Sequence, residues 1–91
     1  MRKYYLISYD LKKPGQNYSE LYDEIKALGD WRHPMESTWV VFAGDTNTVE
    51  IRERLKQKMD QNDSVFVVDI TSADYAGWLP STFWDWFKKQ Q

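Results

Sequence analysis

Apolar and polar residues recur with two different periods along this chain, and the changes of period predict its strands and helices. Residues 3–11 (KYYLISYDL) are rich in β-branched and aromatic residues and run into a turn, which is typical of a strand. Ile7 and Tyr9 fall on one face of this strand, and Tyr4 and Leu6 fall on the other. Because both faces are largely apolar, we expect the strand to be central in its sheet.

Two later segments carry apolar residues at helical spacing. The first covers about residues 18–28 and should stop at Gly29, a typical C-terminal cap, and the second covers about 48–60. Each segment follows a capping box, in which a side chain near the first turn accepts a backbone hydrogen bond. The two boxes are Asn17 with Glu20 and Asn47 with Glu50.

Three further segments are predicted as strands, at 30–35, 37–43 and 64–71. Pro34 cannot donate to a central ladder, so the segment 30–35 should be short and lie at an edge. The order strand, helix, strand, strand, helix, strand predicts an α+β, ferredoxin-like fold. In that fold a four-stranded antiparallel sheet has the spatial order 4-1-3-2, and both helices cover one face.

The 91 residues fit a single domain, with a core of about 3–71 and a tail of 72–91. Aromatic residues make up 16% of the chain, and many of them lie in the tail, where Pro80 could begin a short helix. Exposed aromatic patches are rare on monomers, so we expect the tail to contact a second copy in a homodimer. Stacking on nucleic-acid bases is the alternative. The expected interface residues are Trp78, Phe83, Trp84 and Phe87.

Composition excludes several kinds of chemistry. The chain has no cysteine and one histidine, which excludes disulfides, thiol catalysis and a zinc site made of several histidines of one chain. The net charge of −2 is not the basic excess that nucleic-acid binders usually have. No apolar stretch is long enough to span a membrane and no secretory leader is recognisable, so we expect a cytoplasmic protein without membrane contact.

The predicted topology brings the end of the first strand beside the turn between the second and third strands. The groups expected on this rim are Asp10, Lys12, Lys13, Arg32, His33, Glu36, Ser37 and Asp63. Asp10 either caps a turn or binds a hard cation such as Mg²⁺, which needs only one or two carboxylates. A symmetric dimer would supply the second carboxylate. Ser37 is a candidate partner of Asp10 or a nucleophile with His33 as its base, and plain packing is the alternative for both residues.

Basic residues offer a candidate surface for DNA or RNA. Arg52 and Lys56 form a like-charge pair one helical turn apart, as do Arg54 and Lys58. The basic side chains of such a helix could bind the phosphates of a nucleic acid, and a solvated helix face is the alternative. The candidate nucleic-acid-binding residues are Lys12, Lys13, Arg32, Arg52 and Lys56.

The chain also resembles a known family. The segments 5–11 (YLISYDL) and 36–44 (ESTWVVFAG), with KPG at 13–15, are similar to the small CRISPR-associated adaptation protein, and most of all to its relatives labelled SinR-like. The resemblance covers about residues 3–71. It implies a ferredoxin-like fold, a symmetric dimer, and Asp10 as a Mg²⁺ ligand at the dimer axis.

The function that the resemblance implies is binding of nucleic acid, with metal-dependent endonuclease or ribonuclease activity or a scaffold role. The alternative is a non-catalytic, dimeric protein-interaction module, such as a component of a toxin–antitoxin or defence system that binds a protein partner.

Overall fold

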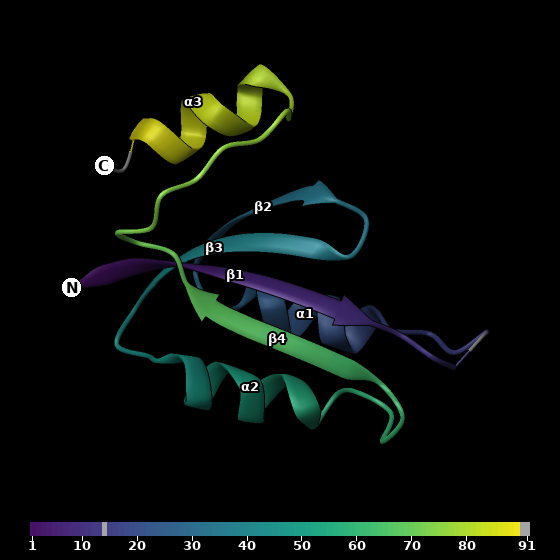
Figure 1. The fold of residues 1–91 in the computed structure, drawn as a ribbon. Helices are drawn as coiled ribbons and strands as arrows, with labels where there is room; N and C mark the ends of the chain where they lie inside the picture. Colours follow the sequence, from purple (N-terminus) through teal and green to yellow (C-terminus); the bar gives the residue numbers. More distant parts are fainter. Residues whose placement is uncertain (14, 90–91) are drawn as a thin grey trace.

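A computed structural model describes residues 1–13 and 15–89 of the chain (Figure 1). Strands and helices follow one another in the order that the sequence predicts, and the short helix expected in the tail follows the last strand. The elements are β1 (Arg2–Asp10), α1 (Ser19–Lys26), β2 (Asp30–Met35), β3 (Thr38–Gly44), α2 (Thr48–Lys56), β4 (Ser64–Asp69) and α3 (Ser81–Lys89).

The four strands form one antiparallel sheet in the order β2-β3-β1-β4, which is the predicted order 4-1-3-2 read from the opposite edge. β1 is central and pairs on both sides, so that Tyr5 lies opposite Val41 of β3 and Asp69 of β4. β2 is an edge strand with an irregular register after Arg32. The ferredoxin-like prediction is therefore confirmed.

Helices α1 and α2 cover one face of the sheet, as predicted (Figure 1). Leu21 and Ile25 of α1 and Ile51 and Leu55 of α2 are completely buried. They pack against inward-pointing residues of the central strands, of which Ile7 is also inaccessible to solvent. This layer is the main hydrophobic core.

Helix α3 packs on the opposite face of the same sheet (Figure 1). Phe87 lies with its ring centroid 4.5 Å from that of Tyr4, whose hydroxyl donates a 2.6 Å hydrogen bond to the Phe87 carbonyl. Phe83 is buried in the same cluster. The Trp86 indole N–H donates to Asp30 Oδ2 at 2.7 Å, which ties α3 to β2. Phe83 and Phe87, which we expected at a dimer interface, are thus largely covered by their own chain.

The limits of the helices differ from the predicted ones at identifiable residues. Asn47 caps α2 by accepting from the Glu50 N–H at 2.9 Å, as predicted, but α2 ends at Lys56. In the first box Asn17 accepts from the Ser19 N–H, and α1 begins without a side-chain cap. Gly29 is not a left-handed cap either. A Cβ there would lie 2.4 Å from the Phe42 carbonyl oxygen, so glycine permits close approach to β3.

Candidate functional site

The end of β1 gathers charged groups, as the topology predicts. Asp10 lies opposite Ser64 of β4, and its Oδ2 is 2.7 Å from the Lys12 ammonium. The Asp63 carboxylate accepts a 2.7 Å hydrogen bond from the Lys12 backbone N–H. Lys13 pairs more loosely with Asp60, at 3.6 Å. Asp10, Lys12, Lys13 and Asp63 therefore share one rim.

Asp63 holds two segments of this rim together through hydrogen bonds. Its carboxylate also accepts from the Asp60 backbone N–H at 2.8 Å and from the Tyr18 hydroxyl at 3.1 Å. Burial by itself would raise the pKa of Asp63, but the hydrogen bonds from Lys12, Asp60 and Tyr18 outweigh it and lower that pKa. The carboxylate thus fixes both the chain after β1 and the turn before β4.

We expect Asp63→Ala to lower the free energy of unfolding at neutral pH by about 1–3 kcal/mol, because the Lys12 N–H, the Asp60 N–H and the Tyr18 hydroxyl lose a charged acceptor. The matched variant Asp10→Ala, which breaks an exposed ion pair, should cost at most about 1 kcal/mol. Because folding lowers the pKa of Asp63, its contribution is full above its unfolded pKa and is lost as the pH falls through the folded one. Urea unfolding at pH 7 and pH 3 tests this, and equal costs for both variants at pH 7 would contradict it.

His33 is held by packing. Its ring stacks on Trp39 with centroids 3.9 Å apart and planes 11° from parallel, and its Nε2 lies 3.0 Å from the Glu36 carbonyl oxygen. The same carbonyl accepts from the Tyr9 hydroxyl at 3.4 Å, which in turn accepts from the Trp39 indole at 3.0 Å. Since a carbonyl only accepts, Nε2 carries a proton in this arrangement. That nitrogen is therefore not a free base in this contact.

Ser37 lies in the exposed turn between β2 and β3, where its carbonyl accepts from the Tyr9 N–H at 3.1 Å. This contact is backbone pairing that continues the β1–β3 ladder. Glu36 likewise contributes its carbonyl to the turn. The contacts around Ser37 and Glu36 are thus those of a hairpin turn, and nothing in them activates the Ser37 hydroxyl.

The five candidate phosphate-binding residues lie in three separate places, and each is paired with a carboxylate. Lys12 and Lys13 are on the rim, whereas Arg52 and Lys56 lie on α2 and flank Glu53 at 3.6 and 3.5 Å. Arg32 is not on the rim. Its guanidinium lies over the Trp86 ring at 4.8 Å and contacts Asp30 at 3.2 Å. These residues do not form one continuous basic surface.

Among the described residues, Asp10 has no cluster of further acidic side chains around it. In the part of the chain that the structure describes, no three Asp, Glu or His side chains are grouped so that they could hold a metal. Asp10 offers a single carboxylate, which is 64% exposed and is shared with Lys12. Mg²⁺ needs only one or two carboxylates, and a second copy of Asp10 in a symmetric dimer would supply the second.

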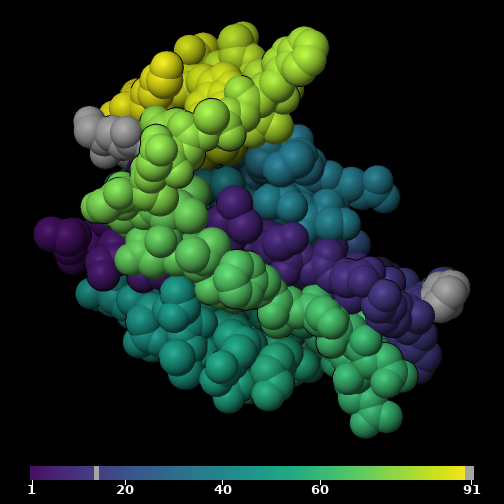
Figure 2. All heavy atoms as spheres, in the orientation of Figure 1, coloured from purple at the N-terminus to yellow at the C-terminus, as the bar shows by residue number. Residues whose placement is uncertain are grey.

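The sheet face that carries α3 is covered only in part. Leu6 and Ser8 of β1 lie opposite Val68 and Phe66 of β4, and Asp10 follows on the same side. Phe66 is largely exposed and Met35 half exposed. In Figure 2 the β1 and β4 segments run uncovered across the front of the molecule beside α3. We call this surface the open face. It consists of Leu6, Ser8, Asp10, Met35, Thr38, Phe66 and Val68.

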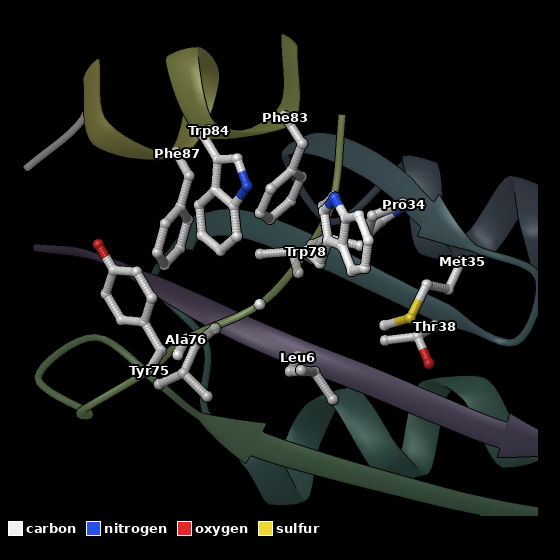
Figure 3. A pocket seen from close by; sticks show the side chains of 14 residues that line it. Leu6, Pro34, Met35, Thr38, Tyr75, Ala76, Trp78, Phe83, Trp84 and Phe87 are labelled. Atoms are coloured by element: carbon white, nitrogen blue, oxygen red, sulfur yellow. The ribbon is translucent and has the colours of Figure 1, made fainter. Parts of the chain in front are cut away.

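An apolar pocket of about 360 Å³ lies where the open face meets α3 (Figure 3). Leu6, Thr38 and Val40 of the sheet form one side, and the opposite side is formed by the α3 rings Phe83, Trp84 and Phe87. Residues 75–79 of the tail run past it and carry Trp78, whose side chain is fully exposed. The sequence pattern indicated that tail aromatics meet a surface, but it did not show that they form the wall of a pocket.

The comparisons with known proteins establish the fold. No family model matches the chain. The chain is similar to a solved structure from Thermus thermophilus, described as the hypothetical protein TT1823. The TM-score is 0.63 and the sequence identity 16%, over 88% of this chain and 96% of that one. In the described residues no helix is long and apolar enough to cross a membrane.

Proposed function

We propose that this protein is a homodimeric protein-interaction module whose two copies pack through the open face of the sheet. The observation that carries the proposal is the exposure of Met35, Phe66 and Trp78 along and beside a half-covered sheet face. Monomers rarely expose contiguous apolar surface of this kind, and such patches usually mark interaction sites. The resemblance seen in the sequence also implies a symmetric dimer.

The size of the molecule agrees with this proposal. A stable interface buries about 800 Å² on each partner. The chain exposes 6069 Å² in total, so such an interface would take roughly an eighth of its surface. A sheet with one open face buries it most simply against another sheet, as in a β-sandwich. A twofold axis then gives both copies the same contacts.

Sedimentation equilibrium tests the proposed dimer. We expect the mass of two 10.9 kDa chains at micromolar concentration and a return to one chain on dilution. A single-chain mass up to about 100 μM would contradict the proposal, because interfaces of standard size usually bind more tightly than that.

A second candidate function is metal-dependent cleavage of DNA or RNA, and the position of Asp10 favours it. Asp10 is on the same side of β1 as Leu6 and Ser8 and therefore belongs to the open face. Dimerisation through this face would bring the two copies of Asp10 close together. Bound Mg²⁺ would supply an activated water for attack on phosphorus. Lys12 and Lys13 on the same rim could hold phosphates once they exchange their carboxylate partners.

The two candidates are separated by assaying purified dimer for Mg²⁺-dependent cleavage of single- and double-stranded oligonucleotides. The second candidate requires cleavage that Asp10→Ala abolishes and Asp60→Ala preserves. Equal cleavage by the Asp10→Ala protein would discard it, and a dimer without cleavage or oligonucleotide binding at low salt supports the interaction module.

A further inference from the structure

We propose that Trp78 of each copy inserts into the apolar pocket beside α3 of the other copy, so that two reciprocal contacts hold the dimer together. This inference rests on the proposed homodimer and goes further, because it names the side chain and the pocket that recognise each other.

The pocket has the size and chemistry to receive an indole ring. Its volume is about 360 Å³. For comparison, an apolar cavity of about 150 Å³ can bind benzene. Aliphatic side chains of the sheet lie below it, and the Phe83 and Trp84 rings stand on the α3 side (Figure 3). Aromatic walls around an inserted ring allow edge-to-face and offset stacking.

Trp78 has the properties of the inserted group. Its side chain is fully exposed, and it forms none of the ring contacts found among the described residues. By contrast, Trp84 stacks on Tyr75 with centroids 5.8 Å apart, and Trp86 is buried. A tryptophan side chain can bury about 150–250 Å². Tryptophan is also among the residues most enriched at the energetic centres of interfaces.

A second copy of this chain is the occupant that the arrangement favours. In a twofold interface, the surface that one copy presents must fit the same surface of the other. Trp78 lies at the margin of its own pocket, and that pocket continues into the open face through Leu6 and Thr38. An axis near this margin would therefore place each indole opposite the other copy's pocket. The two rings alone would bury about 300–500 Å² of a standard interface of about 1,600 Å².

The test uses two variants that each lose one half of the contact. Trp78→Ala removes the inserted ring and leaves the strand and α3 sides of the pocket unchanged. Thr38→Trp fills the pocket from a half-buried strand position and keeps Trp78. Tryptophan is tolerated in strands, and Ala76→Phe is a second filling variant that does not touch the sheet. Circular dichroism confirms folding of each variant.

We expect the homodimer of each variant to dissociate about 1,000-fold more readily than that of the original chain. Both Trp78–pocket contacts are lost in such a homodimer, and each loss should raise the dissociation constant roughly 30-fold. A 1:1 mixture of Trp78→Ala with a filled variant should form a heterodimer that retains one contact. This heterodimer should be about 30-fold tighter than either variant's homodimer. Sedimentation equilibrium with a fluorescent label on one variant measures all three dissociation constants.

The outcomes separate this inference from the proposed dimer. If the original chain dimerises and Trp78→Ala dimerises as tightly, the inference is overturned and the dimer stands. If both variants are weak and their mixture is no tighter, Trp78 contacts something other than the partner's pocket, its own pocket included, and the inference is again overturned. If the original chain is monomeric, both the proposed dimer and this inference are wrong.

Discussion

Replacing Phe87 by alanine is expected to lower the free energy of unfolding by about 3–5 kcal/mol, a large part of the stability of a domain this small. Phe87 is 3% exposed, and its ring lies 4.5 Å from Tyr4 and 5.6 Å from Phe83 between centroids. The substitution leaves a cavity in the layer between α3 and the sheet. Chemical denaturation followed by circular dichroism gives the value.

Trp78→Ala is the control for Phe87→Ala, because both remove an aromatic ring from the tail. Measured at concentrations where the chain is monomeric, it should change the free energy of unfolding by less than about 0.5 kcal/mol, since Trp78 is fully exposed. Equal losses for the two variants would mean that α3 is not packed on its own sheet.

Met35→Asp is expected to weaken the dimer by at least about 100-fold. Met35 lies on the open face opposite Thr38 and is 50% exposed, so a charge there costs the monomer little. In the dimer the same charge would be buried twice, once on each side of the axis, without a partner. The dissociation constant from sedimentation or fluorescence dilution reports the effect.

The matched control for Met35→Asp is Val49→Asp. Val49 is similarly exposed, at 56%, but it lies on α2 in the layer on the other side of the sheet. Its substitution should leave the dissociation constant within a few-fold of the original. If Val49→Asp disrupts the dimer and Met35→Asp does not, the interface lies on the helical layer and the proposed arrangement is wrong.

The fold could be predicted from the sequence because its strands differ in burial. β1 is apolar on both faces, which identifies a central strand, and Pro34 assigns β2 to an edge. These two features, with the element order, are enough to choose the strand order that the structure has. The predicted end of the first helix at Gly29 was wrong. Glycine is needed there because the backbone passes close to Phe42, which is distant in the sequence.

The tail could not be placed from its sequence. Aromatic residues at helical spacing indicate a buried face, and that face can be covered by the same chain or by another. Trp86 was not among the predicted interface residues, yet it is buried and donates to Asp30, 56 positions away in the chain. Only tertiary contacts of this range distinguish Phe87, buried in its own chain, from the exposed Trp78.

The two like-charge pairs of the second predicted helix were inferred from that helix alone. Arg54 of α2 and Lys58, which lies in the turn after α2, each have a carboxylate partner from α1. The Arg54 guanidinium lies 2.6 Å from Glu24, and the Lys58 ammonium 3.9 Å from Glu20. A carboxylate on the neighbouring helix therefore offsets a repulsion that the local sequence suggested was unrelieved.

Cross-linking through single cysteines tests most directly whether the open faces meet in a dimer. The chain has no cysteine, so Ser8→Cys on the open face and Glu53→Cys on α2 each introduce a single thiol. With a short bis-maleimide, we predict that the Ser8→Cys protein forms covalent dimers rapidly at micromolar concentration and that the Glu53→Cys protein stays monomeric. If only the Glu53→Cys protein forms covalent dimers, the two copies do not pack through their open faces. The absence of covalent dimers with both variants would contradict that packing as well.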